Sequence, residues 1–219
     1  MSSPVDLRLY LVTDAALAAP RSLADTVRAA VGGGGSGREA GVTVVQLRDP
    51  NAGGRQLYLA AVELLGVLAT TGVALIVNDR LDVALAAGAQ GTHLGQGDLP
   101  ADRARAIAGP DHVLGFSAAN TSEMASLGEW PDGTVDYLGV GPVRATATKP
   151  NAGAPIGLDG LAETCRLTCL PCVAIGGIDT SNAAAAIHAG AAGIAVVSAI
   201  CAAADPARAA ADLRACVER

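Results

Sequence analysis

The sequence predicts an α/β fold, a single-domain (β/α)8 TIM barrel that covers residues 1–219. Short apolar runs of four to eight residues alternate with longer alanine-rich segments, a pattern typical of βα units around a parallel sheet. Eight such units follow one another, and 219 residues are enough for one barrel. An open doubly wound sheet is the alternative. It is less favoured because no G-x-G-x-x-G follows the first strand, where the sequence instead reads Leu11-Val12-Thr13-Asp14.

Each unit contributes one strand and one helix. The expected strands cover residues 7–13, 43–48, 74–78, 91–94, 113–117, 135–140, 172–176 and 193–198. The expected helices cover residues 23–31, 54–70, 81–87, 101–108, 121–130, 158–168, 181–189 and 206–217.

A glycine-rich insertion at residues 32–37 interrupts the first helical segment. A phosphate-binding loop would continue with Lys and Ser or Thr, whereas Arg38-Glu39 follow here. We therefore expect a flexible surface insertion. It precedes the second strand, so it should lie at the end of the barrel opposite the active site.

Composition narrows the class of protein. The net charge of −6 and the pI near 4.9 argue against a nucleic-acid partner, and 2% aromatic residues leave no platform for stacking bases. Polar residues interrupt every apolar run before the roughly 18 residues of a membrane helix. The first residues lack a basic start followed by an apolar stretch, so no signal peptide is expected. These features predict a cytoplasmic protein without a membrane partner, and they leave a homo-oligomer open.

The five cysteines include the spacing C-x-x-x-C-x-x-C at Cys165, Cys169 and Cys172. Radical enzymes that use S-adenosylmethionine hold an iron–sulfur cluster with this spacing. Here the motif begins on an expected helix and ends at the start of an expected buried strand. Cysteine is also a small buried hydrophobe, so a structural role is favoured over cluster binding.

Catalytic residues of a closed barrel lie at the carboxyl ends of its strands. The polar and glycine residues at those positions, or in the loops that follow, are Gln46, Arg48, Asn78, Asp79, Asp98, Ser117, Thr146, Thr148, Lys149, Gly176, Gly177 and Ser198, with Val197 beside the last. Polar groups should therefore cluster at one end of the barrel.

Two groups of these residues suggest anion sites, and the first group is formed by two aspartates and two cations. Asp79 and Asp98 follow adjacent strands, and carboxylates together with substrate phosphates are typical ligands of Mg²⁺. A helix cap is the alternative for Asp79. Lys149 is the only lysine among fifteen basic residues, and with Arg48 it would meet a magnesium-bound diphosphate.

The loops after the last two strands commonly bind a second phosphate through backbone N–H groups. Two anion sites at one mouth predict two phosphorylated small-molecule substrates. His93 could orient a substrate, act as a base or be satisfied structurally. Ser117 has no evident His or Asp partner along the sequence, so activation as in a catalytic triad is not supported.

These residues resemble the thiamine-phosphate synthase family over residues 9 to about 200. The motifs that carry the resemblance are LYLVTD, VQLRD, IVNDRLDVALAAGAQGTHLGQGDLP, GFSAANTSE, YLGVGP followed by TATKP, AIGGI and VVSAI. The resemblance implies a (β/α)8 barrel that uses Mg²⁺. It also implies a reaction that joins 4-amino-5-hydroxymethyl-2-methylpyrimidine diphosphate to 4-methyl-5-(2-hydroxyethyl)thiazole phosphate and releases diphosphate.

The resemblance also implies residue roles. Catalysis would fall to Lys149, Ser117 and Arg48, and Mg²⁺ to Asp79 and Asp98. The pyrimidine diphosphate would contact Gln46, Arg48, Asn78, Ser117 and Lys149, and the thiazole phosphate Thr146, Thr148, Gly177, Val197 and Ser198.

Two departures from the family pattern concern charge. The family's Arg-Glu-Lys is Arg48-Asp49-Pro50 here, so one diphosphate lysine is missing and Arg55 is a candidate substitute. The family's aromatic-Pro pair before the Thr-x-Thr-Lys is Arg144-Ala145 here, which could add a cation near the thiazole phosphate or face solvent. A thiazole tautomerase and a non-catalytic barrel that binds thiamine phosphate are the competing interpretations.

Overall fold

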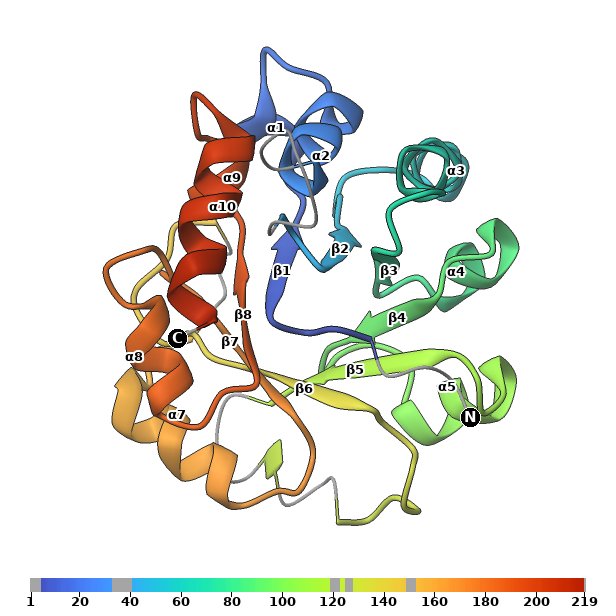
Figure 1. The fold of residues 1–219 in the computed structure, drawn as a ribbon. Coiled ribbons are helices and arrows are strands. Elements are labelled where there is room, and N and C mark those ends of the chain that lie inside the picture. Colours follow the sequence, from blue (N-terminus) through green and yellow to red (C-terminus); the bar gives the residue numbers. More distant parts are fainter. Residues whose placement is uncertain (1–4, 33–40, 119–122, 125–127, 149–152, 219) are drawn as a thin grey trace.

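The chain forms a closed parallel barrel in the strand order β1-β2-β3-β4-β5-β6-β7-β8. The computed structural model describes residues 5–32, 41–118, 123–124, 128–148 and 153–218. The helices lie around the outside of the strands (Figure 1). The strands are β1 Leu9–Val12, β2 Val44–Leu47, β3 Ala74–Asn78, β4 Gly91–Leu94, β5 Val113–Ser117, β6 Tyr137–Val140, β7 Cys172–Ile175 and β8 Gly193–Val196. The predicted fold class is confirmed.

The helices also follow the predicted order. They are α1 Ala15–Ala18, α2 Leu23–Val31, α3 Gly54–Leu68, α4 Leu81–Ala87, α5 Ala101–Ala108, α7 Gly157–Arg166, α8 Ala183–His188, α9 Ser198–Cys201 and α10 Pro206–Val217. Half of the residues of the helix expected over 121–130 lie outside the described residues, as do residues 33–37 of the glycine-rich insertion.

Two short helices were not predicted. Helix α1 begins after Asp14, whose side chain accepts a hydrogen bond from the backbone N–H of Leu17 at 3.0 Å. Ser198 was assigned to the last strand, but it is the first residue of α9. Both helices are one turn long, which is too short for a 3.6-residue periodicity to appear in the sequence.

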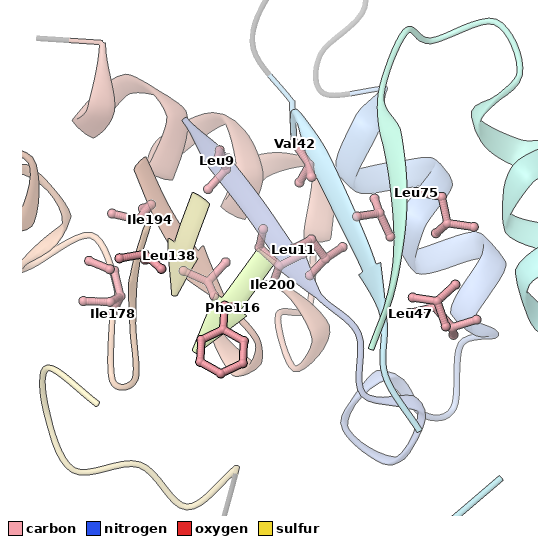
Figure 2. Close-up of a cluster of buried hydrophobic side chains, with 14 of the residues drawn as sticks. Leu9, Leu11, Val42, Leu47, Leu75, Phe116, Leu138, Ile178, Ile194 and Ile200 are labelled. Atoms are coloured by element: carbon pink, nitrogen blue, oxygen red, sulfur yellow. The ribbon is translucent and has the colours of Figure 1, made fainter. Parts of the chain in front are cut away.

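Successive strand residues point to opposite faces, and both faces are buried. Leu9 and Leu11 of β1 belong to a large apolar layer that also contains residues of the surrounding helices (Figure 2). Tyr10 and Val12 of the same strand belong to a smaller cluster with Val44 of β2, Ile76 of β3, Val113 of β5 and Tyr137 of β6. This second cluster fills the inside of the barrel. Inward positions are therefore separable from outward ones by parity along each strand.

Backbone hydrogen bonds continue beyond the strands at the carboxyl end of the barrel. Val143 N donates to Ile175 O at 2.9 Å, and Arg144 N donates to Gly176 O at 2.9 Å. A side chain at Gly141 would collide with the carbonyl group of Ile175, so the close approach of these two segments requires glycine there. The loops that follow β6 and β7 are thereby fixed to each other. Among the described residues, no helix has the length and apolar character needed to cross a membrane.

Candidate active site

The barrel interior carries polar residues at the carboxyl ends of four consecutive strands. Gln46, Asn78, His93 and Ser117 lie on β2, β3, β4 and β5. The first two and Ser117 have the inward parity of Val44, Ile76 and Val113 on their own strands. His93 pairs in register with Asn78 on one side and Gly115 on the other, both at inward positions. The strand-end prediction is confirmed for these four residues.

A continuous series of hydrogen bonds joins three of these residues across the barrel. Gln46 Nε2 donates to the hydroxyl of Tyr10 at 2.9 Å, and this hydroxyl lies 2.8 Å from the hydroxyl of Tyr137. The hydroxyl of Tyr137 lies 3.1 Å from His93 Nδ1, and His93 Nε2 lies 2.9 Å from Ser117 Oγ. We call these five residues the interior chain. It connects five strands, because Tyr10 lies on β1 and Tyr137 on β6.

Both tyrosines of the interior chain are almost fully buried, at 2% exposure for Tyr10 and 1% for Tyr137. Burial raises the pKa of Tyr10 and of Tyr137 well above the usual value for a phenol, because the phenolate would be desolvated. Both hydroxyls therefore keep their protons at neutral pH. Each can donate one hydrogen bond and accept others.

Asp79 and Asp98 are held by the backbone beside His93. Asp79 N donates to His93 O at 2.8 Å, and Asp98 Oδ2 accepts from Gly95 N at 2.7 Å. Among the described residues, Asp79 is the only one other than glycine with a positive φ, at 62°. Helix α4 has Arg80 as its N-cap residue, so Asp79 lies one position before the cap.

The donor set at these two aspartates suits Mg²⁺. Two carboxylates follow adjacent parallel strands, β3 and β4, and Mg²⁺ is usually bound by one or two carboxylates with water and substrate oxygens. No cluster of three or more His, Cys, Asp or Glu side chains that could hold a metal exists within the described part of the chain. A site made of Asp79 and Asp98 would therefore need oxygen ligands from the substrate and from water.

The cationic part of the predicted site is described in part. Arg48 follows β2, is partly buried, and donates its backbone N–H to Thr13 Oγ1 at 3.0 Å. Arg55, the candidate substitute for the missing family lysine, is exposed in the first turn of α3. Lys149 lies outside the described residues. The structure thus fixes Arg48 at the mouth and leaves the roles of the other two cations as predictions.

The residues predicted for the thiazole phosphate come from three loops at the same end of the barrel. Thr146 Oγ1 and Thr148 Oγ1 are 3.3 Å apart, and Thr148 N donates to Thr146 Oγ1 at 3.3 Å. Gly177 has φ 64°, and its carbonyl accepts from Asn182 Nδ2 at 2.8 Å. Val197 is the N-cap of α9, and Ser198 is its first residue. Backbone N–H groups at such positions lack partners within the helix.

The exposed side chain of Arg144 contacts the loop after β7. Its Nη1 donates to Ser181 Oγ at 3.3 Å. A side chain at Gly177 would come within 2.7 Å of Arg144 Cβ. The side chain of Arg144 is exposed and lies beside Gly177, and a role near the thiazole phosphate stays a prediction.

The other two histidines and the cysteine motif are not brought into this cluster. His112 Nε2 lies 2.9 Å from Thr92 Oγ1, and burial lowers the pKa of His112. His188 Nδ1 lies 2.6 Å from the carbonyl oxygen of Ala184 on its own helix. Cys165 lies on α7, Cys169 is exposed after that helix, and Cys172 is buried in β7.

Sequence reasoning missed the histidine partner of Ser117. The prediction that Ser117 lacks such a partner is wrong, because His93 Nε2 lies 2.9 Å away. It also missed Tyr10, Tyr137 and Gln96, whose Nε2 donates to Ser117 O at 2.8 Å. Parity along the strands could not reveal this contact alone, because the contact also depends on the register in which His93 pairs with Gly115, two residues before Ser117.

Comparison with known proteins identifies the family. The family described as "Thiamine monophosphate synthase" matches residues 9–200. The chain belongs to this family. As a member of the thiamine monophosphate synthase family, it is an enzyme of the transferase class.

Individual relatives match over nearly the whole chain. The thiamine-phosphate synthase of Azorhizobium caulinodans is 50% identical over 218 residues, covering 100% of this chain and 98% of the relative. That of Xanthobacter autotrophicus is 52% identical and covers 99% and 98%. The solved structure of thiamine phosphate pyrophosphorylase from Pyrococcus furiosus has a TM-score of 0.85 at 36% identity, and the match covers 98% of this chain and 97% of that one. Neither competing interpretation is favoured by these matches.

Proposed function

We propose that the chain condenses 4-amino-5-hydroxymethyl-2-methylpyrimidine diphosphate with 4-methyl-5-(2-hydroxyethyl)thiazole phosphate. The products are thiamine phosphate and diphosphate. The observation that carries the proposal is the family match over residues 9–200, which includes every strand end with an inward polar residue. The geometry adds that Gln46, Asn78 and Ser117 lie on neighbouring strands at one end of the barrel.

The proposed reaction proceeds by dissociation followed by capture. The bond between the methylene carbon of the pyrimidine and the diphosphate oxygen breaks, and its electron pair leaves with diphosphate. The resulting pyrimidine-stabilised cation is attacked by the lone pair of the thiazole nitrogen, which forms the new C–N bond. No proton has to move in either step. The protein therefore needs to position two substrates and stabilise charge, without a dedicated base.

Five residues are proposed to hold the pyrimidine diphosphate. Gln46, Asn78 and Ser117 lie at inward positions of three strands, and Arg48 follows one of them. Lys149 is assigned to the same substrate from its place in the sequence. Arg48, Ser117 and Lys149 are the proposed catalytic residues, because cationic or hydroxyl donors can stabilise negative charge that develops on the departing diphosphate.

Asp79 and Asp98 are proposed to hold Mg²⁺. Mg²⁺ at this place would neutralise the charge of the diphosphate and help to orient it. The carboxylate of Asp98 is fixed by Gly95 N, and Asp79 is fixed through its backbone to β4. The carboxylate of Asp98 and the backbone of Asp79 are thereby held in place before the diphosphate arrives.

The thiazole phosphate is proposed to bind on the opposite side of the mouth. Gly177 lacks a side chain, which lets a phosphate approach its backbone. Thr146 and Thr148 offer hydroxyls, and Val197 and Ser198 offer backbone N–H groups at the start of α9. This arrangement would hold the thiazole ring over the barrel interior, where the pyrimidine is generated as a cation.

An assay of thiamine phosphate formation tests the proposed function. Purified protein is incubated with both substrates and Mg²⁺, and each of the three is then omitted in turn. We expect thiamine phosphate and diphosphate in equal amounts, and only in the complete mixture. Conversion of a thiazole isomer without diphosphate release would instead identify a tautomerase. Binding of thiamine phosphate without its formation would identify a non-catalytic barrel.

Several broader expectations remain predictions from the sequence. These are a single domain over residues 1–219, a cytoplasmic location, and the absence of nucleic-acid and membrane partners. A homo-oligomer is left open by the sequence. Size-exclusion chromatography with light scattering measures the oligomeric state directly.

A further inference from the structure

With Gln46 Nε2 facing the hydroxyl of Tyr10, the hydrogen bonds of the interior chain have only one direction in which every buried hydroxyl proton finds an acceptor. Gln46 Nε2 is a donor, so the oxygen of Tyr10 is an acceptor in that contact. Among the described residues, the hydroxyl of Tyr10 has hydrogen-bond contacts only with Gln46 and Tyr137. Its proton must therefore go to Tyr137, since the alternative leaves a buried proton unpaired.

The same reasoning assigns the donors in the remaining hydrogen bonds of the interior chain. The hydroxyl of Tyr137 accepts from Tyr10, so its own proton goes to His93 Nδ1 at 3.1 Å. His93 then accepts at Nδ1 and, as a neutral imidazole, carries its proton on Nε2. Nε2 lies 2.9 Å from Ser117 Oγ, so the histidine is the donor in that contact. The hydroxyl proton of Ser117 can then be donated to an acceptor outside the interior chain.

We propose that Tyr10, Tyr137 and His93 are positioning residues that fix Ser117 as a hydrogen-bond donor toward the diphosphate substrate. The proposal rests on the proposed function for the identity of that substrate. His93 and Ser117 have the spacing of a histidine–serine pair in which histidine removes the serine proton. The direction of the interior chain reverses this relation, because His93 Nε2 carries a proton and cannot accept another.

The barrel is built to hold these rings. A side chain at Gly115 would overlap Cζ and the hydroxyl of Tyr137 and come within 2.5 Å of His93 Nδ1. A side chain at Gly139 would come within 3.0 Å of His93 Cε1. Two inward positions on β5 and β6 are thus occupied by glycine, and the space is filled by Tyr137 and His93. The centroids of these two rings are 5.6 Å apart.

Nuclear magnetic resonance of the unliganded wild-type protein tests the direction. In protein labelled with ¹⁵N, the proposal expects a one-bond coupling between proton and nitrogen at His93 Nε2 and none at Nδ1. It also expects a slowly exchanging Tyr137 hydroxyl proton that couples to Nδ1 across the hydrogen bond. His188→Gln, on an exposed side chain, helps to assign the signals. A proton bonded to Nδ1, in either the neutral or the doubly protonated ring, overturns the proposal.

Steady-state kinetics then test whether the interior chain acts through Ser117. Tyr137→Phe keeps the ring and removes the hydroxyl that donates to His93. We expect kcat to fall about tenfold, which is a smaller loss than the ~10²–10³-fold loss expected when a direct donor is removed. KM for the diphosphate substrate should change less than about threefold. Tyr10→Phe should have a smaller effect, because Tyr137 can still donate to His93.

Tyr58→Phe is the matched control, because Tyr58 is an exposed residue of α3. Its kcat should equal that of the wild type. A Tyr137→Phe enzyme with the kcat of this control overturns the positioning role. If the wild-type protein forms no thiamine phosphate, the proposed function fails, whereas the protonation of His93 still decides the direction of the chain.

Discussion

Gly115→Ala should destabilise the protein strongly, because the added methyl group falls on Tyr137. The new Cβ would overlap Cζ and the hydroxyl of that ring. Tyr137 is 1% exposed, so the ring is enclosed in the barrel interior and cannot shift directly into solvent. Overpacking of this kind costs about 1–3 kcal/mol of unfolding free energy. The strain is local to the inside of the barrel.

The displaced ring would also lose its two hydrogen bonds. The hydroxyl of Tyr137 lies 2.8 Å from that of Tyr10 and 3.1 Å from His93 Nδ1. Each bond contributes about 1 kcal/mol, so the total loss becomes ~3–5 kcal/mol. For a chain of this length, 1 kcal/mol corresponds to about 2–4 °C in Tm, so we expect a fall of roughly 6–20 °C.

Thermal unfolding followed by circular dichroism measures the effect. Gly66→Ala is the control, because an alanine there, in the last turn of α3, meets nothing within 4 Å. It should raise stability by about 1 kcal/mol through helix propensity. Gly139→Ala should fall between the two, since its Cβ would be 3.0 Å from His93 Cε1. A Gly115→Ala protein with a Tm within 2 °C of the wild type, as an estimate of measurement error, would refute the reasoning.

Three further predictions concern the proposed reaction. Lys149→Ala should lower kcat by ~10²-fold or more and leave KM for the thiazole phosphate nearly unchanged. The reason is that the lysine acts on charge that grows in the transition state. Steady-state kinetics with unchanged kcat would remove Lys149 from the catalytic residues. Asp98→Ala should raise the Mg²⁺ concentration needed for half-maximal rate about tenfold or more, as a magnesium titration measures. The control is Asp111→Ala, in an exposed loop, which should need the same Mg²⁺ concentration as the wild type. Deletion of residues 33–37 should leave kcat within about twofold, because Val42 N already donates to Ala30 O at 3.1 Å and joins the two flanking segments; a large loss of turnover in a folded deletion variant would contradict this.

The fold was predictable from the sequence because its elements repeat a clear alternation. Helices α2, α4, α5 and α10 have the predicted boundaries, since glycine, proline or a capping residue marks their ends. Helices α1 and α9 were not predicted, because a single turn leaves too few residues for a periodicity. The position of Ser198 depends on α9, so its assignment to a strand was wrong.

The candidate site was predictable where one rule sufficed. Parallel strands of a closed barrel all end at the same mouth, so Gln46, Asn78 and Ser117 could be grouped without coordinates. The same rule could not show which of them interact, since an interaction also requires that side chains face the same side of the sheet. Parity along a strand answers that question only after the register between neighbouring strands is known.

The interior chain illustrates what closure adds. Tyr10 and Tyr137 are 127 residues apart and lie on strands that are not neighbours, yet their hydroxyls are 2.8 Å apart. Neither spacing nor register between adjacent strands places them together, because their contact spans the inside of the barrel. Gly115 and Gly139 leave room for the rings of Tyr137 and His93, since inward positions without side chains allow a neighbour's ring to approach the backbone. A pair of inward glycines beside an inward histidine therefore predicts that a large polar residue from another strand reaches it.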